Sequence, residues 1–293
     1  MASDKQIAVG VVFPQTEIGA DVGGVRAYAE AAQDLGYRHL LIYDHVLGAD
    51  PEAYAPWSGP YTAYTMFHEV LVLFGFMAAV VPEMELVTSV IILPQRQTAL
   101  VAKQAAEVDV LTGGKLRLGV GIGWNWVEYD GLGMNFKNRG RRFEEQIELL
   151  RRFWQEPIFT HEGRYEHVKS AGINPLPIQR PIPIWIGGSA EAALKRAAEV
   201  ADGFFPQRPL EGGWPATLER MKAWREAAGK DWSGYGIEAR INAGTGTPDD
   251  WRKTLEEWTA LGATHITVNT MNGGLKGAEQ HIQRIREVKA ALG

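Results

Sequence analysis

The dipeptide Asp44-His45 is the first candidate for chemistry in this sequence, because an imidazole changes its charge near neutral pH. It directly follows the apolar segment 39–43, which we expect to be a β-strand. A neutral imidazole at a strand end could hydrogen-bond a substrate oxygen or move a proton. A purely structural histidine is the alternative interpretation, and we take His45 as the candidate catalytic residue.

Glycines alternate at the end of a second apolar segment, in the run GVGIGW at residues 119–124. A strand tip without side chains lets a flat ring lie against the backbone. A dinucleotide fingerprint would need a helix that begins at the glycines and holds a pyrophosphate, but residues 125–133 show no clear helical period. We therefore predict a wall for a planar ring at Gly121, Ile122 and Gly123; a tight strand end that needs small residues is the alternative.

Gly187-Gly188-Ser189 stands between the strand-like segment PIPIWI and the helix-like segment AEAALKRAAEV. Free N–H groups, the helix dipole and the Ser189 hydroxyl would form a phosphate cradle there. A glycine turn with Ser189 as the helix N-cap is the alternative, and the two interpretations are compatible.

Four cations, Lys137, Arg139, Arg141 and Arg142, crowd the start of another predicted helix. Cations at a helix N-terminus oppose its dipole, although glutamates three or four residues away offset this. A solvated charged face is one interpretation. An anion-binding patch for a cofactor tail or a subunit contact is the other.

Strand-like and helix-like segments that could position these groups alternate eight times. We predict one domain over residues 1–293, a single (β/α)8 TIM barrel with insertions after strands 2 and 4. An open doubly wound sheet is the rival. The predicted strands are 7–13, 39–43, 86–93, 116–122, 183–186, 203–206, 236–241 and 264–269, and the predicted helices are 24–35, 65–80, 98–111, 138–154, 190–200, 214–228, 249–261 and 278–292.

Composition narrows the class of protein. The chain has 293 residues, 45% of them hydrophobic and 22% charged, with no cysteine and a net charge of −5. The lack of cysteine excludes disulfides, thiolate metal sites and cysteine nucleophiles, and points to a cytoplasmic protein. Without a long basic run, or an apolar run of the ~20 residues that span a bilayer, we expect no nucleic-acid or membrane partner. No metal site is predicted.

Taken together, these residues resemble the bacterial luciferase-like superfamily, and specifically its coenzyme F420-dependent oxidoreductase branch. The resemblance runs from the first strand to about Pro206 and is looser beyond it. Any one of the motifs would be weak, but together they are specific. They are Tyr43-Asp44-His45, the segment 88–124, Glu128, the block RGRRFEE at 139–145 and the segment 174–206.

The resemblance implies a TIM barrel, often dimeric, and we expect a homodimer. It implies a tricyclic ring against strands two to four with its phosphate on Gly187-Gly188-Ser189. It also implies a cis peptide at Ser89–Val90 that pushes a bulge against the ring, and it matches Asp44 and His45 to the ring-contacting and catalytic pair. The cofactor-binding residues that we predict are Phe13, Asp44, Ser89, Val90, Gly121, Ile122, Gly123, Gly187, Gly188 and Ser189.

One departure concerns the substrate. Relatives that oxidise sugar phosphates carry a carboxylate just after the glycines of strand four, where this chain has Trp124. The general acid is missing at that point, which argues against sugar-phosphate oxidation. Trp124, with Trp57, Tyr61 and Trp126, suggests a more apolar, aromatic substrate pocket. Glu128 lies nearby in the sequence.

We therefore predict an oxidoreductase that transfers a hydride between F420 and a small organic substrate, with His45 donating or orienting a proton. A flavin mononucleotide (FMN)-dependent monooxygenase of the same superfamily is the enzymatic alternative. A non-catalytic flavin- or deazaflavin-binding protein is the second alternative, because fold does not determine function.

Overall fold

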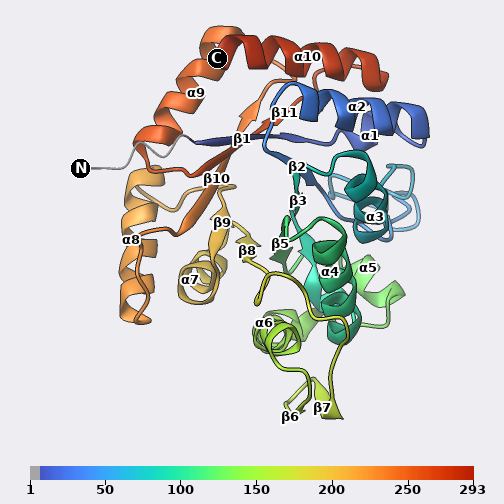
Figure 1. The fold of residues 1–293 in the computed structure, drawn as a ribbon, viewed down its shortest axis with the longest axis vertical. Coiled ribbons are helices and arrows are strands. Elements are labelled where there is room, and N and C mark those ends of the chain that lie inside the picture. The colour runs from blue at the N-terminus through green and yellow to red at the C-terminus, as the bar shows by residue number, and fades with distance from the viewer. Residues whose placement is uncertain (1–6) are drawn as a thin grey trace.

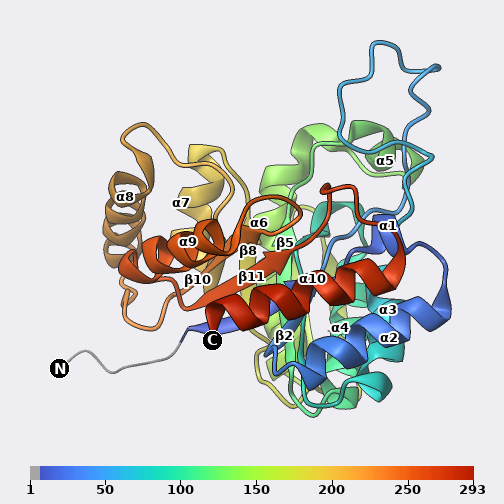
Figure 2. The ribbon, with the colours of Figure 1, turned by 90° about the horizontal axis from the view of Figure 1, so that it is seen from above.

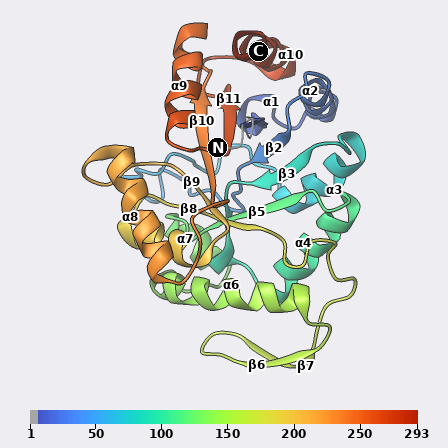
Figure 3. The same cartoon turned by 60° about the vertical axis from the view of Figure 1, so that its left-hand side comes forward.

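Eight parallel strands, each followed by at least one helix, close into a barrel in the computed structural model, which describes residues 7–293 (Figure 1). Neighbouring strands run in the order β1, β2, β3, β5, β8, β9, β10, β11 and back to β1, while β4 continues the third barrel strand beside β5. The helices surround the strands, as Figure 3 shows. The predicted (β/α)8 fold is confirmed.

The elements follow the predicted alternation along the whole described chain. The strands are β1 (Ala8–Val12), β2 (His39–Ile42), β3 (Glu85–Thr88), β4 (Ile91–Ile92), β5 (Leu116–Gly121), β6 (Phe159–Glu162), β7 (His167–Ala171), β8 (Ile184–Gly187), β9 (Gly203–Phe205), β10 (Gly236–Asn242) and β11 (His265–Asn269). The helices are α1 (Gln15–Ile18), α2 (Val22–Asp34), α3 (Val70–Val80), α4 (Thr98–Leu111), α5 (Trp126–Gly131), α6 (Arg139–Gln155), α7 (Glu191–Val200), α8 (Gly213–Ala227), α9 (Pro248–Ala260) and α10 (Gly277–Leu292), with short 3-10 turns η1 (Leu93–Gln95) and η2 (Phe136–Asn138).

The third barrel strand is broken rather than continuous, which corrects the single predicted strand 86–93. Leu86 pairs with Leu116, an offset of 30 residues, whereas Ile91 pairs with Val120, an offset of 29. One extra residue therefore lies between the two pairings, as in a β-bulge. The Ser89–Val90 peptide at this break is cis, as the family resemblance implied.

Two helix predictions need correction. The helix predicted for 65–80 begins only at Val70, where the Glu69 carboxylate caps it by accepting from the Val72 N–H at 2.8 Å. Residues 125–133, expected to be irregular, contain α5. The Asn125 side chain caps this short helix by accepting from the Glu128 N–H, so that N–H has a partner within the protein.

The two predicted insertions lie at the end of the barrel where the strands terminate. Residues 43–69 follow β2, and α5 with η2 follows β5. Figure 2 shows the first insertion rising beyond the barrel next to α5. The hairpin β6–β7 projects on the far side of α6, away from the strands (Figure 3). Over residues 7–293, no helix is long and apolar enough to cross a membrane.

The opposite end of the barrel encloses a charged cluster, which we call the closed-end cluster: His39, Glu85, Arg117, Glu238 and Thr267. His39 Nε2 lies 2.9 Å from Glu238 Oε1, and Arg117 binds both Glu238 and, at 2.8 Å, Glu85. Burial raises the pKa of Glu238, but Arg117 and His39 outweigh burial and hold it far below its usual value. Gly10 makes room, because a Cβ there would meet the His39 ring at 2.2 Å.

Candidate active site

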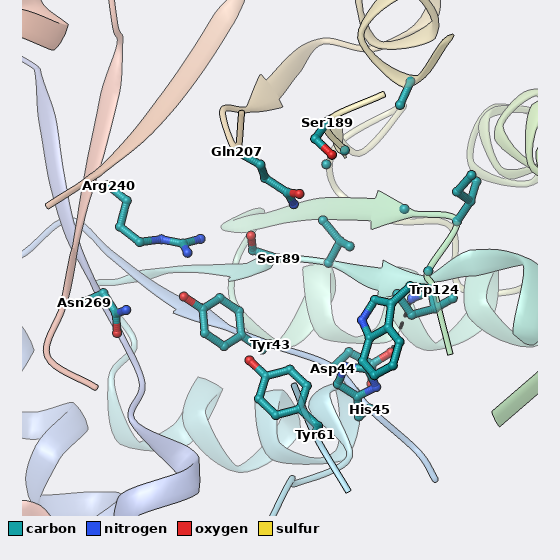
Figure 4. A pocket seen from close by; sticks show the side chains of 18 of the residues that line it. Tyr43, Asp44, His45, Tyr61, Ser89, Trp124, Ser189, Gln207, Arg240 and Asn269 are labelled. Atoms are coloured by element: carbon teal, nitrogen blue, oxygen red, sulfur yellow. Dashed lines mark hydrogen bonds between the residues drawn. The ribbon is translucent and has the colours of Figure 1, made fainter. Parts of the chain in front are cut away.

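A cavity of about 500 Å³ opens at the C-terminal ends of the barrel strands, where active sites of this fold lie (Figure 4). Its walls come from strands around the whole barrel. The residues predicted from the sequence that line it are Asp44, His45, Ser89, Val90, Gly121, Ile122, Gly123, Trp124, Gly187, Gly188 and Ser189.

Three predicted site residues do not line this cavity. Phe13 is fully buried behind it, because its ring packs against Tyr28 and His68. Trp57 lies behind Trp124, with their ring centroids 5.8 Å apart. Glu128 was expected in the substrate pocket, but it is fully buried and contacts His45 instead.

His45 and Glu128 form a hydrogen-bonded pair at the edge of the cavity. His45 Nδ1 lies 3.2 Å from Glu128 Oε2, while Glu128 Oε1 accepts from the backbone N–H groups of Val46 and Leu47. Burial raises the pKa of Glu128, but the bonds from His45 and Val46 outweigh burial and lower it. Because an ionised carboxylate only accepts, the His45 proton belongs on Nδ1, and Nε2 is left for the cavity.

Aromatic rings hold His45 on its other sides. Its ring centroid lies 5.0 Å from that of Tyr61, 4.9 Å from that of Phe67 and 5.8 Å from that of Trp124. Tyr61 and Phe67 come from the insertion after β2, so this insertion packs against the imidazole while Glu128 holds its Nδ1. The side chain keeps only 12% of its surface exposed. His45 therefore has one orientation and one open edge.

Asp44 borders the cavity, but its carboxylate is used by the protein. Oδ1 accepts from Arg96 at 2.7 Å, and Arg96 also binds Glu69, the cap of α3, at 2.8 Å. Burial raises the pKa of Asp44, and Arg96 opposes that effect. Asp44 thus links the end of β2 to α3 and helps to place His45.

Gly121 and Gly187 make room for the side chain of Val90, rather than leaving only bare backbone for a flat ring. A Cβ on Gly121 would lie 2.7 Å from the Val90 side chain, and a Cβ on Gly187 would lie 2.8 Å from it. Val90, which follows the cis peptide, therefore occupies the space that both glycines leave. A flat ligand at this wall would meet Val90 as well as bare backbone.

The predicted phosphate cradle is open to the cavity. Helix α7 begins at Glu191, and its N-cap is Ala190, which makes no side-chain cap. Ser189 is therefore not the N-cap, and its side chain reaches the cavity (Figure 4). The Ala193 N–H donates to the Ala190 carbonyl at 2.8 Å. The N–H groups of Glu191 and Ala192 have no acceptor within the helix, so they and the Ser189 hydroxyl can bind an anion.

The cationic block at the start of α6 contributes nothing to this cavity. Arg142 binds Glu166 of the hairpin region at 3.0 Å and donates to the Pro94 carbonyl at 2.7 Å. Arg139 lies over the Phe136 ring, 3.7 Å from its centroid. Arg139 and Arg142 therefore brace loops, which favours a structural interpretation of these two arginines over an anion-binding role.

Several lining residues were missed from the sequence, some of them on or just after the last strands. They include Arg240 near the end of β10, Asn269 at the end of β11 and Gln207 after β9, together with Tyr43. Tyr61, which was expected in the aromatic substrate pocket, also lines the cavity. Figure 4 shows Arg240 and Asn269 on one side of the cavity and His45 and Trp124 on the other. Polar residues that end predicted strands were the available signal for Arg240 and Asn269.

Comparison with known proteins shows a family match over most of the chain. The model of the luciferase-like monooxygenase family matches residues 7–243. An uncharacterised protein of Mycobacterium bovis is 36% identical over 212 residues, which cover 69% of this chain and 71% of that protein. The FMNH2-dependent dimethylsulfone monooxygenase of Pseudomonas putida is 31% identical over 187 residues, which cover 61% of this chain but only 50% of that enzyme.

A solved structure with a different cofactor has the same fold. The coenzyme F420-dependent tetrahydromethanopterin reductase of Methanopyrus kandleri superposes with a TM-score of 0.75 over 98% of this chain and 99% of that one, at 15% identity. The proteins similar to this chain thus include one named as FMNH2-dependent and, with the same fold, one named as coenzyme F420-dependent.

Proposed function

Because the chain belongs to the luciferase-like monooxygenase family, we propose that it is an oxidoreductase that transfers a hydride between coenzyme F420 and a small organic substrate. The observation that supports this proposal is the His45–Glu128 pair, because His45 lines the same cavity as Val90, Gly121 and Gly123 of the predicted ring wall. A deazaflavin supplies the hydride when bound, and the protein must place the substrate and manage a proton.

The cavity has separate places for the two parts of such a cofactor. Val90, Ile122 and the backbone at Gly121 and Gly123 would hold the ring, and Gly188 with Ser189 would hold the phosphate. The apolar wall excludes water from one face of the ring position. The orphan N–H groups at the start of α7 match the charge of a phosphate.

His45 would accept or donate the proton that accompanies hydride transfer. Glu128 holds Nδ1–H, so a neutral imidazole accepts a proton at Nε2 and a protonated one donates from it. A substrate oxygen that gains or loses negative charge during hydride transfer would meet this nitrogen. Trp124 and Tyr61, beside His45, give the substrate an aromatic environment.

Titration of the apo-protein with F420 and with FMN, followed by quenching of tryptophan fluorescence, tests the proposal. We expect micromolar binding of F420 and binding of FMN at least about tenfold weaker. Tight FMN binding with negligible F420 binding would overturn the choice of cofactor.

An FMN-dependent monooxygenase is the second candidate, and two observations favour it. The FMNH2-dependent relative is 31% identical to this chain. In addition, two of the arginines that could bind the polyanionic tail of F420 have other partners: Arg142 binds Glu166 and a backbone carbonyl, and Arg139 lies over Phe136. Oxygen consumption that depends on reduced FMN and on added substrate would identify this activity.

A further inference from the structure

Arg240 is a charged residue that lines the cavity and has no role in the proposed cofactor contacts or proton transfer. It extends from the end of β10, and its guanidinium carbon lies 5.3 Å from the centroid of the Tyr43 ring on β2. Within residues 7–293, no Asp or Glu oxygen lies within ion-pair distance of it. A guanidinium without a carboxylate partner, facing a ligand cavity, is available to bind an anion.

The charges around the cavity leave this cation uncompensated. Asp44 is the one acidic residue that lines the cavity in the described chain, and its carboxylate is held by Arg96. Glu238 precedes Arg240 by two residues on the same face of β10, but it is bound by Arg117 and His39. The cavity therefore carries one unpaired positive charge.

The groups around Arg240 also offer hydrogen-bond donors. The Asn269 side-chain oxygen accepts from the Met271 N–H at 3.1 Å, which directs the amide nitrogen of Asn269 to other partners. The Tyr43 hydroxyl is buried and has no hydrogen-bond partner among the described residues. A guanidinium, an amide N–H and a phenol hydroxyl together suit an oxyanion better than a cation or an apolar group.

The position of Arg240 separates it from the predicted cofactor contacts. In the order of strands around the barrel, β10 lies opposite the broken third strand that carries Ser89 and Val90. The phosphate cradle lies on β8 and α7, at a third place on the rim. A ring held against Val90 and a phosphate held at Ser189 leave Arg240 on the side where a substrate would lie.

We infer that Arg240, with Asn269 and the Tyr43 hydroxyl, binds a carboxylate or sulfonate group of the substrate. This inference rests on the proposed function, because it assigns the ring to the opposite wall. The substrate would then be an organic anion whose reactive part lies near His45 and Trp124. Arg240 would select such an anion over a neutral molecule of the same shape.

Calorimetric titration of the cofactor-loaded protein with benzoate, benzenesulfonate and neutral benzamide tests this inference. We expect at least one of the two anions to bind about tenfold or more tightly than benzamide. Arg240→Met should remove that preference and leave benzamide binding unchanged, and Arg240→Lys should retain part of it. Arg208→Met is the matched control, because Arg208 is exposed near the rim but does not line the cavity.

Other outcomes would overturn either the inference or the proposed function. Equal binding of anions and amide by the wild type overturns it, as does an Arg240→Met variant that keeps the preference. If Arg240→Met weakens cofactor binding about tenfold, the oxyanion belongs to the cofactor and the inference is wrong. Failure of the wild type to bind either cofactor contradicts the proposed function instead, and the same titrations on the apo-protein still decide the role of Arg240.

Discussion

Two histidine–glutamate pairs lie at opposite ends of this barrel and do different work. His39 and Glu238 lie 2.9 Å apart in the closed-end cluster, and each side chain is 1% exposed. His45 and Glu128 lie 3.2 Å apart at the open end, where Glu128 is 1% exposed but His45 is 12% exposed. The residue types and the spacing are alike, so the surroundings make the difference.

The closed-end pair is surrounded by partners. Arg117 and Thr267 also bind Glu238, and Arg117 continues to Glu85. The side chains of His39, Arg117 and Glu238 are each 2% exposed or less, so their charges must be compensated by neighbouring groups rather than by water. At the open end, Glu128 is satisfied by two backbone N–H groups and by one nitrogen of His45, which leaves the other nitrogen free for a ligand. One pair therefore serves the fold, and the other is the pair that we propose for chemistry.

Removing the charge of Glu238 should have the largest effect on stability. Glu238→Gln leaves Arg117 with Glu85 as its one carboxylate partner. It should lower the free energy of unfolding by about 3–5 kcal/mol, because the buried guanidinium loses its buried partner. Urea denaturation followed by circular dichroism measures this change. Glu162→Gln is the control, since its pair with His167 is exposed and should be worth about 0.5 kcal/mol or less. Similar losses in both variants would contradict the comparison.

Replacing His45 should instead affect turnover. We expect His45→Gln to lower the rate of hydride transfer about a hundredfold, the usual contribution of a general acid or base. Its unfolding free energy and cofactor dissociation constant should change little. The measurement is oxidation of reduced F420 with a panel of aldehydes and enones. A variant with undiminished turnover would remove His45 from the chemistry and favour a cofactor-binding protein.

The sequence predicts the open end better than the closed end. The eightfold alternation of strand and helix identifies the barrel, and the strand-end rule then brings His45, Ser89 and Gly188 to one rim. Arg117 and Glu238 look like ordinary strand residues, because nothing local shows that they meet across the barrel. Their pairing depends on barrel closure, a long-range property.

The errors at the site have a similar origin. Glu128 follows the glycine strand closely and was expected in the substrate pocket, but helix α5 turns it towards Val46 and Leu47. Arg240 lies beyond Pro206, where the family motifs are weak, so no motif drew attention to it. Both positions depend on how distant loops and strands meet, which short-range patterns do not encode.

The pH dependence of stability offers a smaller test of the closed end. Burial and the nearby Arg117 lower the pKa of His265 to about 4, from 6.5 in an unfolded chain. Between these values the unfolded chain binds more protons, so stability is complete above pH 6.5 and falls as the pH drops towards 4. His265 alone should remove about 2 kcal/mol between roughly pH 7 and 5.

Urea midpoints of the wild type and His265→Gln at neutral and mildly acidic pH measure this contribution. The variant should lose less stability on acidification than the wild type. His167→Gln, which alters an exposed histidine, should keep the wild-type dependence. Equal pH dependence in the wild type and His265→Gln would show that His265 titrates normally in the folded protein.

The smallest expected effect, and the most specific, concerns the proton on His45. Glu128→Gln keeps an oxygen for the Val46 and Leu47 N–H groups, but it can place an amide N–H₂ opposite His45 Nδ1. A donor there favours the tautomer with its proton on Nε2, so turnover should fall about tenfold. Nitrogen-15 chemical shifts of His45 should show the proton moving from Nδ1 to Nε2. Reduced turnover with an unchanged tautomer would mean that Glu128 acts only through packing, and the open-end pair would then be structural like the closed-end one.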